Sequence, residues 1–260
     1  MPSSDPKLFD VHLHAEGLTD QDLESLHFFG VQRAIVPAHA TFAEPSAKRL
    51  LDQFGNLVDK QLARLSKAGI RAHAALGIHP RAIPRRGVPE ILSALPSYFR
   101  QGKVVALGPV GLFEDTEVER EVMTEQLLLA RRLKVKVLVT TPAKNREAVT
   151  RRTLQLLLGS GVPPSRVLVD GAISTTLAPI RACGFHAALM LHPDGLTADA
   201  AVALIRRSGV ERLCLSSHAG DGASDIVGLA RAQSLMLRAK LTESLIRRVT
   251  LKNAERFFSA

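Results

Sequence analysis

Short apolar runs alternate along the chain with longer amphipathic stretches. The apolar runs are rich in β-branched residues, which is typical of buried strands. The stretches between them carry apolar residues at helical spacing, and several end in glycine, as helices often do. Eight strands are predicted, at residues 8–14, 33–38, 71–79, 103–111, 134–141, 166–172, 186–191 and 212–217.

Strands that alternate with helices are typical of parallel βαβ units. The clearest predicted helices are residues 47–69, 119–133, 197–209 and 226–237. Eight such units in 260 residues match the size of a (β/α)8 TIM barrel. Because no linker-like tract divides the chain, we expect an α/β fold with a single barrel domain over residues 1–260.

The composition, 46% hydrophobic and 23% charged, is that of a soluble globular protein. The opening MPSSDPK lacks the apolar core of a signal peptide, and no apolar run is long enough to cross a membrane. We therefore expect a cytoplasmic protein with no membrane partner. The only cysteines, Cys183 and Cys214, lie far apart, which argues against a disulfide framework or a thiolate metal site.

The net charge of +9 suggests a nucleic acid or an acidic small molecule as a partner. The basic residues, however, are scattered in short groups, a pattern typical of solvated helix faces. The charge therefore leaves nucleic acid open as a substrate and does not predict it as a separate partner. The groups lie at residues 84–87, 130–136, 150–152, 205–207 and 246–248.

The stretch FDVHLHAEGL, residues 9–18, places Asp10, His12 and His14 at every second position. In an extended strand alternate side chains point the same way, so all three share one face. A single histidine is usually a core residue satisfied by hydrogen bonds. Two histidines spaced by one residue and preceded by an aspartate favour metal binding or catalysis instead.

Chemistry in a TIM barrel lies at the C-terminal ends of the strands. Several polar residues there also have plain structural uses. Thr140 and Thr141 suit the cap of the following helix, Asp170 suits a turn, and His79 precedes a proline that holds it extended. The candidate residues at these strand ends are Asp10, His12, His14, His39, His79, Thr140, Thr141, Asp170, His192, Ser216, Ser217, His218 and Asp221.

Six motifs resemble, in order along the chain, the TatD-like metal-dependent hydrolases of the amidohydrolase superfamily. The resemblance implies a TIM barrel whose one- or two-metal centre activates water to cleave phosphoester bonds. TatD proteins are described as magnesium- or zinc-dependent deoxyribonucleases. The motifs are D-x-H-x-H, GIHP (77–80), VVALGPVGL (104–112), VLVTTP (137–142), VLVDGAIS (167–174) and KNAERFF (252–258).

Compared with the family pattern, the metal site is depleted. His12 and His14 match the metal ligands of the first strand. Pro109 stands where the family has the glutamate that bridges two metals, Thr140 replaces the histidine of the fifth strand, and Gly171 replaces that of the sixth. A two-metal centre is therefore not expected, because a bridging carboxylate is the usual support of such a centre.

A mononuclear site needs a third ligand, and the candidates at this end of the barrel are His79, Asp170, His192, His218 and Asp221. The eighth strand is a reasonable source, because it neighbours the first in a closed barrel. His218 and Asp221 are the two candidates there, and we predict His12, His14 and His218 as ligands of a divalent zinc, manganese or magnesium ion. Asp221 or Asp170 would accept the proton from water, and Asp10 would orient a ligand imidazole. His79, Thr140 and His192 are predicted to contact the substrate.

Two functions follow from this pattern. The first is hydrolysis of a phosphoester or a similar small acidic substrate by a metal-activated water. The second is a catalytically inactive pseudoenzyme that binds a metabolite or a protein partner at the same end of the barrel. Metal content separates them, because only the first requires a bound cation.

Overall fold

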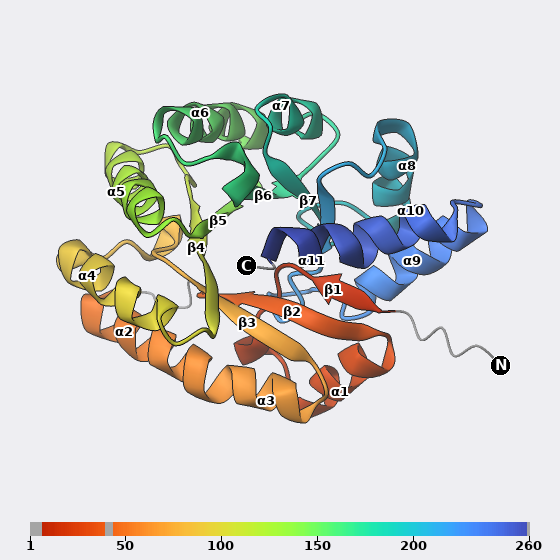
Figure 1. The fold of residues 1–260 in the computed structure, drawn as a ribbon, viewed down its shortest axis with the longest axis horizontal. Helices are drawn as coiled ribbons and strands as arrows, with labels where there is room; N and C mark the ends of the chain where they lie inside the picture. Colours follow the sequence, from red (N-terminus) through yellow and green to blue (C-terminus); the bar gives the residue numbers. More distant parts are fainter. Residues whose placement is uncertain (1–6, 40–43, 259–260) are drawn as a thin grey trace.

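The computed structural model describes residues 7–39 and 44–258, which form a ring of eight parallel strands surrounded by helices (Figure 1). The strands follow one another around the sheet in chain order. This confirms the predicted single-domain TIM barrel. The strands are β1 (Leu8–Asp10), β2 (Val31–Pro37), β3 (Arg71–Leu76), β4 (Val104–Gly111), β5 (Lys136–Thr140), β6 (Val167–Ala172), β7 (His186–Met190) and β8 (Leu213–Ser216).

The helices pack outside the strands and begin at residues whose side chains suit helix starts. Thr19 and Thr116 each form a reciprocal capping box with a carboxylate three residues later. The predicted helix 47–69 is one continuous rod in which a π-helical turn, Leu57–Gln61, joins two α-helices. The helices are α1 (Asp20–Phe28), α2 (Ala47–Asn56), α3 (Leu62–Lys67), α4 (Val88–Phe99), α5 (Glu117–Leu133), α6 (Arg146–Gly159), α7 (Leu177–Ala182), α8 (Ala198–Ser208), α9 (Gly228–Arg238), α10 (Glu243–Arg247) and α11 (Asn253–Phe258).

The first strand is shorter than the sequence pattern predicts. β1 ends at Asp10, so His12 and His14 lie beyond the strand, in the segment that leads to α1. The Asp10 carboxylate accepts a hydrogen bond from the amide of His12, at 3.1 Å, and this local bond takes the place of strand pairing. Beyond this point the chain is held by the segment that follows β8.

Backbone hydrogen bonds link the segment that follows β1 to β8 and to the segment after it, and close the barrel. The amide of Val11 donates to Leu215 at 3.2 Å, and the amide of His218 donates to His12 at 2.9 Å. The interior is filled by one side chain or more from each strand, including Phe9, Ile35 and Leu168. Phe257 and Phe258 of α11 plug the N-terminal end, where Phe258 lies 5.8 Å from the ring of Phe9. The barrel therefore opens to a polar cavity only at its C-terminal end.

No helix in the described part of the chain is both long enough and apolar enough to span a bilayer.

Candidate metal centre

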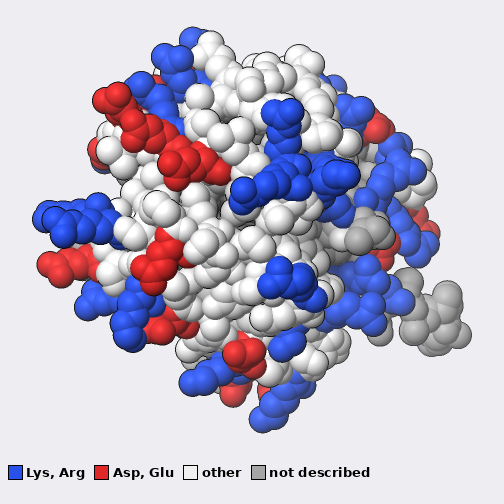
Figure 2. Space-filling model, turned by 60° about the vertical axis from the view of Figure 1, so that its left-hand side comes forward, with Lys and Arg blue, Asp and Glu red and all other residues white. Residues whose placement is uncertain are grey.

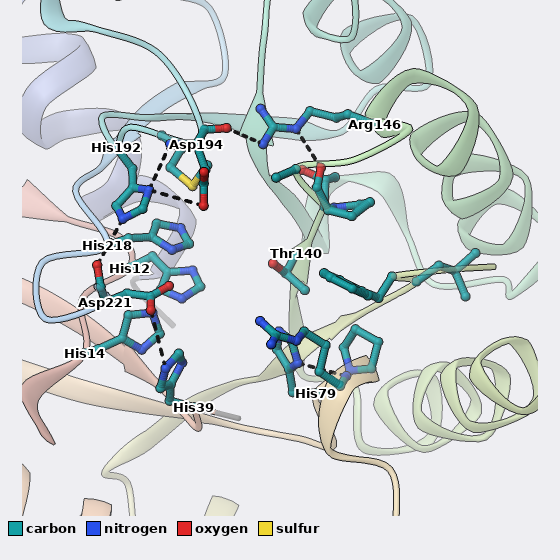
Figure 3. Close-up of a pocket in the computed structure, with 18 residues that line it drawn as sticks. His12, His14, His39, His79, Thr140, Arg146, His192, Asp194, His218 and Asp221 are labelled. Atoms are coloured by element: carbon teal, nitrogen blue, oxygen red, sulfur yellow. Dashed lines mark hydrogen bonds and ion pairs between the residues drawn. The ribbon is translucent and has the colours of Figure 1, made fainter. Parts of the chain in front are cut away.

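A cavity of about 110 Å³ lies at the C-terminal end of the barrel (Figure 3). It is smaller than the roughly 300–1,000 Å³ typical of sites for drug-sized ligands. Only a small group therefore fits inside. Its walls include all the predicted metal and substrate-binding residues and Asp221, namely His12, His14, His79, Thr140, His192, His218 and Asp221.

Three buried histidines converge on one side of this cavity. Each of His12, His14 and His218 offers one ring nitrogen, and these atoms all lie within 4.8 Å of one another. The rings of His12 and His218 stack with their centroids 3.8 Å apart. The structure thus brings together the three residues predicted as metal ligands, whereas Asp221 lies outside the group.

Backbone pairing sets the positions of these rings. The amide of His14 donates to the carbonyl of Ala219 at 2.7 Å, beside the bond that joins His218 to His12. His218 has a φ of 50°, a left-handed conformation that is uncommon for a residue with a side chain. This turn after β8 places the His218 ring against the segment that carries His12 and His14.

Asp170, at the end of β6, holds two of the three histidines. Its Oδ2 lies 2.7 Å from Nε2 of His218, in a hydrogen bond. It lies equally 2.7 Å from Nδ1 of His12, but without the alignment of a hydrogen bond. Its Oδ1 accepts from the hydroxyl of Ser216 at 2.7 Å and from the amide of Gly171 at 2.8 Å. The carboxylate therefore has a partner on every side.

These contacts decide the charge of Asp170. Burial by itself raises the pKa of a carboxyl, but the attraction of His218 and the contacts with both imidazoles outweigh burial. The pKa of Asp170 is accordingly held well below its usual range. Its carboxylate is thus a weak proton acceptor and a strong support for the two rings.

Two of the three histidines, His12 and His14, are held neutral. Burial, with repulsion from His218, lowers the pKa of His12 to about 4. Burial, with repulsion from the neighbouring histidines, lowers the pKa of His14 well below its ordinary value. Because a metal binds the unprotonated imidazole, both rings are ready to bind a cation at neutral pH.

Unpaired ring nitrogens provide the test of whether a metal fits. Nε2 of His12 and Nδ1 of His14 are buried and have no hydrogen-bond partner, whereas Nδ1 of His12 faces Asp170 at 2.7 Å. Buried polar atoms are rarely left unpaired, and a cation would supply the missing partner. Three imidazoles with an open fourth position suit a catalytic zinc, whose ligand atoms lie about 3–4 Å from one another. The rings need to close by about 1 Å to share such an ion.

The same residues do not fit a second metal. Pro109 and Gly171 offer no side-chain donor, and Gly171 has a φ of 81° that disfavours any other residue. Thr140 lines the cavity but contributes only a hydroxyl. The centre therefore fits one cation.

Asp10 differs from its predicted role. Its carboxylate accepts hydrogen bonds from the amide of Ser217, at 3.1 Å, and from the Ser217 hydroxyl, in addition to the amide of His12. It thus ties β1 to β8 through the backbone, and the carboxylate that supports an imidazole is Asp170. Burial raises the pKa of Asp10 to about 6 despite these bonds.

Asp221 and His192 lie at the rim of the cavity. Nε2 of His192 donates to the carbonyl of Asp221 at 3.0 Å, and Nδ1 accepts from the amide of Asp194 at 3.1 Å. The Asp221 carboxylate is half exposed and lies 3.7 Å from Nε2 of His39. His39 in turn packs against the His14 ring, so the rim and the metal centre are in contact.

The opposite wall of the cavity holds His79, Thr140 and Thr141. Thr140 is the last residue of β5, and Thr141 follows it. Nδ1 of His79 accepts from the amide of Arg81 at 3.0 Å, and burial lowers its pKa to about 3. Thr140 faces the cavity, whereas Thr141 donates its hydroxyl to the carbonyl of Asp170 at 2.8 Å. Both threonines line the cavity, and the Thr141 hydroxyl is already hydrogen-bonded.

Arg146, which the sequence pattern did not single out, completes this wall (Figure 3). It is buried and donates from Nε to the carbonyl of Pro142 and from Nη2 to that of Asp194, each at 2.7 Å. Its position directly after the loop that follows β5 was the available signal, because such loops form the active sites of TIM barrels.

Comparison with known proteins identifies the family. The sequence profile described as TatD related DNase matches residues 9–155, more than half of the chain. The chain belongs to the TatD-related DNase family. This confirms the resemblance seen in its motifs.

One relative of this TatD-like chain is described as a metal-dependent hydrolase. An uncharacterized metal-dependent hydrolase of Methanocaldococcus jannaschii is 27% identical over 96% of this chain and 99% of its own. The crystal structure of a TatD-like protein of Archaeoglobus fulgidus is similar with a TM-score of 0.82 and 28% identity, covering 97% of this chain and 100% of that one. The phosphotriesterase homology protein of Escherichia coli, at a TM-score of 0.74 and 16% identity over 98% of this chain and 100% of that one, shares the fold.

Proposed function

We propose that this TatD-like protein is a hydrolase that works with a single divalent cation held by His12, His14 and His218. The observation that supports it is the convergence of three buried imidazoles, two of which have unpaired ring nitrogens. A cation bound there supplies Lewis-acid activation of water. Zinc or manganese suits the imidazoles better than magnesium, which prefers oxygen ligands.

In this proposal Asp170 is a positioning residue. By accepting the proton of His218 Nε2, it fixes that ring and leaves Nδ1 of His218 for the metal. Its low pKa argues against the proton-accepting role predicted from the sequence. That role falls to Asp221, whose carboxylate is half exposed at the rim of the cavity.

We further propose that the substrate carries an anionic group that Arg146 binds. Burial lowers the pKa of Arg146, and among the described residues no carboxylate lies within ion-pair distance of it. The two carbonyl bonds fix the guanidinium and leave Nη1 free of hydrogen bonds to those residues. A phosphoryl or carboxylate group in the cavity would pair this buried charge. The bond cleaved is then a phosphoester or a similar ester of a small acidic compound, or of a nucleic acid end.

One observation favours the second function, a metabolite-binding or protein-interaction scaffold without catalysis. Asp170 contacts both His12 and His218 at 2.7 Å, so two of the imidazoles have a carboxylate partner without any metal. A chain that has lost three ligand positions of the family could keep its fold in this way. Metal content decides between the two functions.

The deciding experiment measures metal by plasma mass spectrometry in protein purified without chelator. We expect near-stoichiometric zinc or manganese in the wild type and its loss in the His12→Ala, His14→Ala variant. His73→Ala, a change of a histidine in β3 outside the cavity, should keep the metal. Absence of metal in the wild type, with a thermal midpoint that EDTA leaves unchanged, would support the scaffold.

A further inference from the structure

The two ends of the barrel differ in charge. In this topology every helix-to-strand connection lies at the N-terminal end of the barrel. These connections contain very few acidic residues. Glu211 is the one acidic residue in these connections. The strand starts and connections at this end carry Arg33, Arg71, Lys103, Lys136, Arg166 and Arg212.

The strand-to-helix connections at the C-terminal end have both signs. Arg81, Arg85, Arg86 and Lys144 there are matched by Glu16, Glu44, Glu114, Asp115, Asp194, Asp221 and Asp225. The connections around the cavity with the histidines therefore carry a net negative charge, and those at the N-terminal end carry a net positive one. Figure 2 shows Lys and Arg side chains crowded in the right half of the view and most Asp and Glu towards the left.

The C-terminal helices add a basic groove to the N-terminal end. A groove of about 1020 Å³ is lined by Arg33, Arg247, Arg248, Lys252 and Arg256, with Glu243 and Glu255 as its acidic residues. Glu255 pairs with Arg33 at 3.1 Å and with Lys252 at 2.7 Å. Among the described residues no carboxylate lies within ion-pair distance of Arg247. Arg248 pairs with Glu211. Five basic residues against Glu211, Glu243 and Glu255 leave the groove with an excess of positive charge.

We propose that this basic groove, with the adjoining Arg71, is a docking surface for a nucleic-acid backbone. Closely spaced phosphates match a row of cations, and the planar guanidinium of arginine binds phosphate with two parallel hydrogen bonds. Arg71 extends the row, because it shares a second depression with Arg33. A strand held here lies at the opposite end of the barrel from His12 and is bound without being cleaved.

The shape of the groove favours nucleic acid over a membrane of anionic lipids. A single strand can follow a concave groove, whereas a flat layer of lipid headgroups cannot fill one. Peripheral helices also insert an apolar face into the bilayer. On α10 and α11, Leu245 at 39% exposure is the one large apolar side chain that is exposed.

Fluorescence anisotropy of a labelled single-stranded DNA of about 20 nucleotides, in EDTA and low salt, tests this surface. We expect the double variant Arg71→Glu, Arg247→Glu to weaken binding at least tenfold, because it reverses two charges of the proposed surface. Both side chains are exposed and neither makes an ion pair that the fold requires, so the variant should fold. The slope of log K against log salt should fall by about 1.4, since each lost phosphate contact removes about 0.7. Arg85→Glu, Arg86→Glu has the same change in charge at the other end and should bind within about twofold of wild type.

Any of several results would overturn the proposal. They are no binding by the wild type at about 50 mM salt, loss of binding in the Arg85, Arg86 variant, or tighter binding to vesicles of anionic lipid at equal phosphate. The uncharged variant Arg71→Gln, Arg247→Gln guards against misfolding, and its fold is checked by circular dichroism. A folded glutamine variant that binds as tightly as wild type would also contradict the proposal. The outcome is independent of metal content and hydrolysis.

Discussion

Asp170, in β6, and His218, in the turn after β8, meet through a 2.7 Å hydrogen bond from imidazole to carboxylate. The same carboxylate oxygen lies 2.7 Å from His12, so one acidic residue holds two of the three proposed metal ligands. Carboxylates that orient ligand histidines commonly change metal affinity by about 10–100-fold.

Asp170→Asn is accordingly expected to weaken zinc binding by about 10–100-fold. The amide can still contact Ser216 but no longer provides the charge that fixes His218. Competition with a chromogenic chelator measures the affinity. Asp194→Asn, which alters an exposed carboxylate at the rim, is the control. Equal affinity in wild type and Asp170→Asn would remove the positioning role.

Arg146→Gln should raise KM for an anionic ester by about 10–100-fold, since hydrogen bonds between charged groups contribute about 1.5–3 kcal/mol. The kcat should change little, because Arg146 binds the substrate away from the bond that breaks. An uncharged ester of the same acid should be hydrolysed equally by both proteins. Arg151→Gln, on the exposed side of α6, should behave as wild type. An equal loss on both esters would show that Arg146 serves the fold.

Gly171→His, which restores the family's residue in β6, should destabilise the protein by about 2 kcal/mol or more and create no second metal site. Gly171 has a φ of 81°, and a Cβ at this position would collide with the Thr141 hydroxyl. Thr140→His restores the neighbouring family ligand on the cavity wall and should cost less. Urea denaturation compares the two variants, and equal stability of Gly171→His and wild type would refute the steric argument.

The metal-free protein should lose stability as the pH falls from 7 to 5. Burial lowers the pKa of His79 from 6.5 to about 3, so below pH 6.5 the unfolded chain binds a proton that the folded protein does not. His12, His14 and His186 act in the same direction. Asp10, whose pKa is raised to about 6, acts in the opposite one. The net loss should be about 4–6 kcal/mol.

His79→Gln should reduce this loss by about 1–2 kcal/mol, because glutamine can accept the Arg81 amide without titrating. Urea denaturation at pH 7, 6 and 5 measures the slope for both proteins. An unchanged slope in the variant would mean that His79 does not remain neutral in the folded state.

Much of the fold and part of the site could be predicted from local sequence. Alternating strands and helices predicted the barrel, and strand ends pointed to His12, His14, His79 and His218. The predicted length of β1 was wrong. The pattern of alternating side chains continues to His14, but the hydrogen bond from the His12 amide to Asp10 ends the strand. Asp10 was assigned the support of an imidazole that Asp170 provides.

The sequence by itself determined the barrel, the family and the loss of donors at Pro109, Thr140 and Gly171, because periodicity and residue identity are local properties. Only the tertiary structure decided which third ligand converges, since the meeting of His218 with His12 depends on strands separated by most of the chain. The tertiary structure also brings together, at one end of the barrel, basic residues that are scattered along the sequence. Parallel strands all begin at the same end, so charges far apart in the chain become neighbours in space.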